Sequence, residues 1–128
     1  GTAEKAACVV QVDLLSCNTA SKDADIASAD ALALYPSSAD SRGNGDAFRH
    51  CYWSARMVHT VGYSASQKIS TTHEVVGSDS GKQPQADENM DMANNRTGWA
   101  VGKGTSSISA AKNSCAAKAT AGALVTIN

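Results

Sequence analysis

Four cysteines stand far apart in this chain, at Cys8, Cys17, Cys51 and Cys115. They form no CxxC pair, and their spacings do not match a zinc framework. An even number of widely spaced cysteines is typical of disulfide bonds, which persist in exported proteins. Of the three connectivities that four cysteines allow, we expect Cys8–Cys17 as a local loop and Cys51–Cys115 as a long-range link. A cytosolic protein with four free thiols is the alternative.

Length and charge narrow the class of protein. A chain of 128 residues forms one domain, residues 1–128, and buries roughly two-thirds of its unfolded surface. Its net charge is −1 and only 18% of its residues are charged, which excludes the basic footprint of a nucleic-acid binder. No segment is long and apolar enough for a transmembrane helix. We expect a secreted monomer whose signal peptide has been removed or lies outside the printed sequence.

Helical spacing of apolar residues dominates the chain and predicts an all-α fold. Pro36 should end one helix and Gly62 another, and loop-forming residues fill 36–45 and 77–84. A short extended tail is expected at 124–127. The predicted architecture is a compact bundle of five to six helices held by two disulfides, with helices over 3–16, 22–35, 44–58, 64–75, 85–101 and 106–119.

The helix that starts near Asn44 carries three ionisable side chains of different types on one face. With Asn44 as the N-cap, Asp46, Arg49 and His50 follow at i, i+3 and i+4 spacing, and Trp53 extends the same face. Such residues are poor material for an apolar core. They therefore predict a buried polar network or a reaction site.

The helix over 85–101 has a face that changes from polar to small residues. Its glycines would allow another backbone to approach closely, and its amides and carboxylate would then face that neighbour. The residues of this face are Asp91, Asn94, Asn95, Gly98 and Gly102.

Polar clusters on three successive helices can meet if the helices pack side by side. We expect His50 to act as a general base oriented by Asp91 or Glu74, because a carboxylate fixes the imidazole tautomer and stabilises the imidazolium. Arg49, or the amides of the third cluster, could hold an anion or an oxyanion. The clusters are Asp46/Arg49/His50, His73/Glu74 and Asp91/Asn94/Asn95.

Structural roles compete with these assignments. Asp46 lies in a first helical turn, where the helix dipole stabilises a negative charge, and Arg49 could simply pair with it. Metal ligands are not assigned, since no HExxH or HxH spacing occurs and residues 77–88 lack the pattern of a calcium loop. Zinc and calcium therefore stay open as cofactors, with ligand types available at His50, His73, Glu74 and Asp91.

The order DAFRHCYW, HE and MDMANNRTGWAVG resembles a helical domain of unknown function in bacterial exported and toxin-like proteins. The resemblance covers residues 43–102 and supplies no activity. It implies that one site contains Asp46, Arg49, His50, Trp53, His73, Glu74, Asp91, Asn94 and Asn95.

A weaker resemblance links the chain to secreted bacterial phospholipases A2, which are small, all-α and held by two disulfides. The Arg49-His50 pair is similar to the pair that opens their central helix. Cys51, however, stands where those enzymes carry a calcium-binding aspartate. The resemblance implies a His base and ester hydrolysis, without a basis for calcium dependence.

Three functions follow as hypotheses. The first is a secreted hydrolase with a His50–carboxylate site, acting on a lipid ester or another cell-envelope substrate. The second is a glycosidase of cell-wall polysaccharide with Glu74 as acid and Asp91 as base or nucleophile. The third is a non-catalytic exported binding or inhibitor module. Contact of both carboxylates with His50 favours the first, and a fully closed polar cluster without a pocket favours the third.

Overall fold

The computed structural model describes residues 2–38, 42–79 and 83–127, and for residues 78 and 79 only the backbone. Six helices occupy these ranges and no strand is found in them, so the all-α prediction is confirmed. The helices are α1 (Thr2–Gln11), α2 (Leu14–Leu34), α3 (Asn44–Thr60), α4 (Tyr63–Asp79), α5 (Gln85–Gly104) and α6 (Ile108–Thr120).

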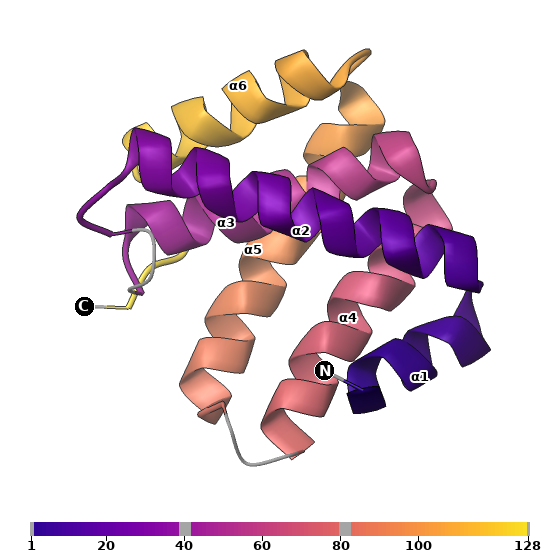
Figure 1. Ribbon diagram of the computed structural model, residues 1–128. Helices are drawn as coiled ribbons and strands as arrows, with labels where there is room; N and C mark the ends of the chain where they lie inside the picture. Colours follow the sequence, from indigo (N-terminus) through magenta and orange to yellow (C-terminus); the bar gives the residue numbers. More distant parts are fainter. Residues whose placement is uncertain (1, 39–41, 80–82, 128) are drawn as a thin grey trace.

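Helix α3 is the centre of the bundle (Figure 1). It packs against α2, α4, α5 and α6, while α1 lies at the periphery against α4 and α2. Helices α4 and α5 also pack against each other, which makes a three-helix group with α3. None of the helices in the described ranges combines the length and apolar character that a membrane span requires.

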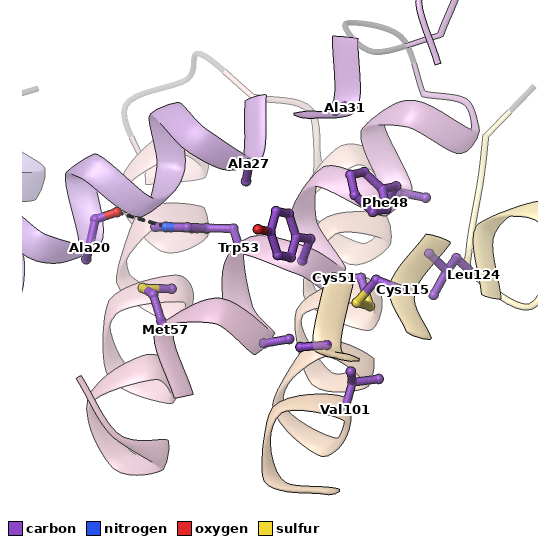
Figure 2. Close-up of a cluster of buried hydrophobic side chains, with 14 of the residues drawn as sticks. Ala20, Ala27, Ala31, Phe48, Cys51, Trp53, Met57, Val101, Cys115 and Leu124 are labelled. Atoms are coloured by element: carbon purple, nitrogen blue, oxygen red, sulfur yellow. Dashed lines mark hydrogen bonds between the residues drawn. A yellow bond between two sulfur atoms is a disulfide. The ribbon is translucent and has the colours of Figure 1, made fainter. Parts of the chain in front are cut away.

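The apolar core lies between α2, α3 and α6 (Figure 2). Small residues of α2, Ala27 and Ala31, are fully buried and let that helix approach the aromatic face of α3. On that face the rings of Phe48 and Tyr52 stack with their centroids 5.5 Å apart. The core therefore combines the large side chains of α3 with the small residues of α2, which allow close helix packing.

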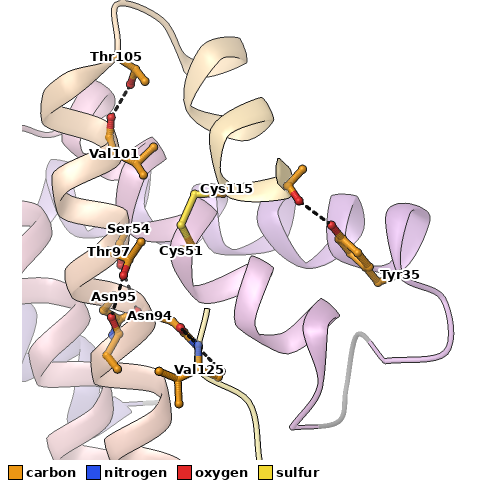
Figure 3. The surroundings of a disulfide bond; sticks show 12 residues. Tyr35, Cys51, Ser54, Asn94, Asn95, Thr97, Val101, Thr105, Cys115 and Val125 are labelled. Atoms are coloured by element: carbon orange, nitrogen blue, oxygen red, sulfur yellow. Dashed lines mark hydrogen bonds between the residues drawn. A yellow bond between two sulfur atoms is a disulfide. The ribbon is translucent and has the colours of Figure 1, made fainter. Parts of the chain in front are cut away.

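Both expected disulfides are present. Cys8–Cys17 joins α1 to the start of α2, and Cys51–Cys115 joins α3 to α6 (Figure 3). The second bond is fully buried and crosses 64 residues of sequence. It thereby ties the last helix to the central one.

Helices α3 and α5 approach closely at two glycines, as the small-residue face predicts. A Cβ atom at Gly98 would lie 2.3 Å from the carbonyl oxygen of Cys51, and one at Gly102 would lie 2.6 Å from Cβ of Val58. Neither position has room for a side chain. The backbone of α5 consequently lies directly on α3.

The N-terminal helices differ from the prediction. The expected helix over 3–16 is interrupted at Val12 and Asp13, because the Asp13 carboxylate accepts from the backbone N–H of Ser16 and caps a new helix. Cys17 and Asn18 therefore lie inside α2 instead of ending a helix. The predicted helix 22–35 is the second half of α2, and it ends before Pro36 as expected.

The start of α3 also differs in detail. Gly43 occupies the N-cap position and Asn44 is the first helical residue. Free N–H groups of the first turn are satisfied by Ser38, whose hydroxyl accepts from Gly45 and whose carbonyl accepts from Asp46. Gly62, with φ of +102°, ends α3 as predicted.

The other boundaries move by a few residues. Helix α4 continues to Asp79, into the predicted loop over 77–84, and α5 continues to Gly104. Residues 39–41 and 80–82, which belong to the two predicted loops, lie outside the described residues.

Replacement of Gly98 by alanine should destabilise the fold, because the added methyl group meets a backbone carbonyl that cannot move without separating α3 from α5. We expect a loss of about 1–3 kcal/mol in the free energy of unfolding, measured by urea denaturation. Gly104→Ala on the same helix is the matched control, since nothing lies within 4 Å of its Cβ position. Equal stability of the two variants would contradict the close packing.

Removal of the two disulfides should have unequal effects. In the loop-entropy description, Cys51–Cys115 contributes about 4 kcal/mol and Cys8–Cys17 about 2.5 kcal/mol, because the first closes the longer loop. Thermal unfolding of the C51A/C115A and C8A/C17A double variants compares them. A larger loss for C8A/C17A would show that the α1–α2 corner stabilises the fold more than the core link.

Candidate functional site

The three packed helices bring three predicted side chains to one point. His50 of α3 directs its Nε2 atom toward α4 and α5, 3.6 Å from Oε1 of Glu74 and 3.3 Å from Oδ2 of Asp91. All three side chains are nearly removed from solvent, with exposed fractions of 3% for His50, 0% for Glu74 and 7% for Asp91. We refer to these residues together with Asp46 and Arg49 as the polar cluster.

Asp46 fixes the orientation of the His50 ring. The backbone carbonyl of Asp46 lies 2.9 Å from Nδ1 of His50, one helical turn further along α3. Since a carbonyl oxygen only accepts, Nδ1 must carry a hydrogen in this arrangement. Nε2 is therefore the nitrogen available for chemistry.

The side chain of Asp46 has a different partner. Its Oδ1 accepts from a terminal nitrogen of Arg49 at 2.6 Å, and it lies 3.4 Å from Nδ1 of His50. This satisfies the carboxylate on the side of the ring away from Nε2. The first predicted motif thus holds His50 between a backbone carbonyl and an ion pair.

The pKa values follow from burial and from these contacts. Burial alone would lower the pKa of His50, but close contacts with the carboxylates of Asp46, Asp91 and Glu74 outweigh it and raise the pKa well above the usual range. Burial raises the pKa of the Asp91 carboxyl, and the charges of Glu74 and Asp46 add to this effect. Burial raises the pKa of Glu74, but the contacts with His50 and Gln83 outweigh this effect and lower the pKa. These shifts favour the protonated form of the His50 imidazole, and Asp91 is the carboxyl of the cluster whose pKa is raised.

Glu74 is the most deeply buried member of the cluster. Its Oε2 accepts from the side-chain amide of Gln83 at 2.9 Å, whereas Oε1 has no hydrogen-bond partner among the described residues. A buried carboxylate oxygen without a donor is costly and requires an explanation. Gln83 was not predicted, because it lies just before α5 and belongs to no periodic pattern.

His73 lies beside the polar cluster, on the side that is open to solvent. Its Nδ1 contacts Oε1 of Glu4 at 2.8 Å, and Nε2 lies 4.0 Å from Oε1 of Glu74. The His73 ring also meets the Trp53 ring edge-on, with centroids 5.3 Å apart. Trp53 in turn donates to the carbonyl of Ala20, which anchors α2 to α3 (Figure 2).

A cavity of about 540 Å³ reaches the polar cluster from α1, α2, α3 and α4. This size is typical of small-molecule sites. Its wall combines two cationic side chains, two imidazoles and an apolar surface, formed by Lys5, Arg49, His50, His73, Trp53 and Ile69. Phe48 and Met57 of the same helix are fully buried in the core and do not line the cavity.

The two asparagines of α5 lie away from this cavity. Asn94 binds the backbone of Val125 with both ends of its amide, at 2.9 Å each, and so holds the C-terminal tail (Figure 3). Asn95 accepts from the hydroxyl of Ser54 at 3.1 Å, which joins α5 to α3. The hydrogen bonds of the two amides hold parts of the fold together, and neither amide lines the cavity.

The fold and the site define a class: a disulfide-linked, all-α domain, with six helices in the described ranges, that has a buried histidine–carboxylate cluster beside a pocket. The chain belongs to the family described as "Domain of unknown function (DUF6973)", which matches residues 7–123. That match contains both disulfides and every member of the polar cluster. No solved structure matches the chain.

Asn94→Ala should release the tail, because two hydrogen bonds to the Val125 backbone disappear at a buried position. We expect the unfolding free energy to fall by about 1–3 kcal/mol and the amide of Val125 to exchange faster with solvent. Asn89→Ala on the exposed face of α5 is the control. Unchanged exchange at Val125 would contradict the clamp.

Proposed function

We propose that the domain is a hydrolase that activates water where the polar cluster meets the pocket. The observation that carries this proposal is the position of His50. Its Nδ1–H is fixed on a backbone carbonyl, its Nε2 faces two carboxylates, and the residue also lines the pocket. This combination supplies an imidazole at the pocket wall with two proton acceptors directly behind it.

The protonation states favour a division of roles. A carboxylate of Asp91 or Glu74 would accept the proton of the attacking water, and the charged imidazole would stabilise the negative charge that develops on the substrate. This differs from the expectation that His50 itself is the base, because a raised pKa favours the imidazole that already holds its proton. Arg49 is placed to bind an anionic group in the pocket.

The two alternative functions receive less support. A glycosidase needs its carboxyl groups on opposite sides of a sugar, yet Glu74 and Asp91 both turn toward the same nitrogen of His50. A closed binding module agrees with the burial of the cluster. The pocket that reaches His50 is the observation that favours a hydrolase over such a module.

An ester of a lipid is the substrate class to test first. The pocket wall offers Trp53 and Ile69 to an apolar chain and Lys5 and Arg49 to an acidic head group. Two disulfides support an exported protein, since such bonds persist outside the reducing cytosol. The bacterial toxin-like and phospholipase-like resemblances remain predictions that agree with this class.

Hydrolysis of nitrophenyl esters of increasing chain length and of phospholipid vesicles tests the proposal directly. His50→Ala should lower kcat/KM by at least about 100-fold, because it removes both the charge and the partner of the two carboxylates. The matched control is His59→Ala, which lies on the same helix and bonds Thr105 instead of the cluster. It should retain wild-type activity.

Two results would contradict the proposed function. One is the absence of hydrolysis by the folded wild-type protein across the ester panel and a peptidoglycan substrate. The other is equal activity of the His50 and His59 variants when circular dichroism shows that both are folded.

A further inference from the structure

We propose that His73, oriented by Glu4, is the general acid of the pocket and protonates the leaving oxygen of the substrate ester. The inference rests on the proposed function and adds the proton donor that this function needs. His73 of α4 and Glu4 of α1 both line the cavity that reaches His50. They form a second histidine–carboxylate pair, which is separate from the polar cluster.

The contact between Glu4 and His73 fixes the orientation of the imidazole. Oε1 of Glu4 lies 2.8 Å from Nδ1 of His73, which is hydrogen-bond distance. This hydrogen bond lowers the pKa of the Glu4 carboxyl, although burial opposes it, so Glu4 is an anion that only accepts. Nδ1 therefore carries a hydrogen, and Nε2 is the nitrogen of His73 that exchanges a proton with a substrate. A carboxylate in this position also stabilises an imidazolium.

His73 differs from His50 in its exposure. The His73 side chain is 38% exposed and that of Glu4 is 30%, whereas the His50 side chain is only 4% exposed. Nε2 of His50 also faces two carboxylates of the polar cluster. His73 is therefore the imidazole that is better placed to donate a proton to a substrate in the cavity.

Helix α1 is held against α4 and α2, which keeps Glu4 beside His73. The side-chain amide of Gln11 donates to the hydroxyl of Thr72 at 3.0 Å, so α1 and α4 are joined at a second point. The Cys8–Cys17 disulfide ties the middle of α1 to the start of α2. These links fix the position of the carboxylate relative to the imidazole, as an orienting group requires.

The unpartnered oxygen of Glu74 connects this pair to the polar cluster. Oε1 of Glu74 lies 3.6 Å from Nε2 of His50 and 4.0 Å from Nε2 of His73. The second distance is too long for a hydrogen bond, so Glu74 leaves Nε2 of His73 free to contact a substrate. Oε1 lacks a donor among the residues that the structure describes, which suits a group that takes up a proton during the reaction.

Ester hydrolysis requires two proton transfers, and each has a group at this site. As the water oxygen bonds to the carbonyl carbon, one water proton passes to a carboxylate of the polar cluster. As the bond from that carbon to the leaving oxygen breaks, the oxygen keeps the electron pair and takes the proton from Nε2 of His73. The products are a carboxylic acid and an alcohol. Transfer of a proton from Glu74 to Nε2 of His73 then restores both groups.

Two esters that differ only in their leaving group test this role. The 4-nitrophenyl and ethyl esters of butyric acid share an acyl group, but only ethoxide needs a proton in order to leave. We expect His73→Gln to lower kcat/KM by at least about 100-fold on the ethyl ester and to leave the nitrophenyl ester nearly unchanged. A purely structural role would lower both values together.

Two further variants complete the experiment. Glu4→Gln removes the orienting charge, so it should show the same difference between the two esters at a smaller magnitude. His59→Gln is the matched control, because His59 bonds Thr105 instead of lining the cavity, and it should hydrolyse both esters as the wild type does.

The outcomes separate the two proposals. Equal losses on the two esters, or wild-type activity of folded His73→Gln on the ethyl ester, overturn the role of His73 and leave the hydrolase standing. Wild-type protein that hydrolyses only the nitrophenyl ester has the same meaning, since it protonates no alkoxide. Absence of hydrolysis of both esters by the wild type overturns both proposals.

Discussion

The direct packing of α5 on α3 is the contact on which the site depends. Gly98 lies against the carbonyl of Cys51, the residue that follows His50, and no side chain separates the two backbones. Asp91 stands two turns earlier on the same face of α5. Because the contact at Gly98 sets both the spacing and the register of the helices, it brings Asp91 to His50. A wider helix pair would leave the imidazole and the carboxylate apart.

Burial of the polar cluster lowers the folding stability of a small domain. Buried ion pairs seldom stabilise a fold more than apolar packing does, and an unpaired buried oxygen is unfavourable. The protein nevertheless places His50, Glu74 and Asp91 together, although more than half of its apolar core is alanine and disulfide-bonded cysteine. Two disulfides offset part of this cost. The arrangement makes sense when the cluster binds or transforms something that enters through the pocket.

Much of this arrangement was predictable from the sequence, because local spacing determines it. The helices, the cysteine pairing and the close approach at Gly98 and Gly102 follow from periodicity and residue type. The sequence also predicted that polar clusters on three helices can meet if those helices pack side by side. Their meeting point at Nε2 of His50 required the packing of α3, α4 and α5, which local pattern does not contain.

The errors have equally physical causes. Asp13 interrupts a run with helical spacing, and only its bond to Ser16 reveals that it begins a new helix. The role of Asn94 in holding the C-terminal tail was missed, because its partner Val125 is 31 residues away and could not be inferred. Gln83 and Glu4 act through contacts of the same long-range kind with Glu74 and His73.

An NMR titration of the His50 imidazole in the wild type and in Asp91→Asn tests most directly whether the packing of α5 on α3 brings Asp91 to His50. Because the nearby carboxylates raise the pKa of His50, we expect the imidazole to titrate well above the usual range of histidine in the wild type and at a lower pH in the variant. A His50 pKa in the usual range, or the same pKa in both proteins, would contradict this packing.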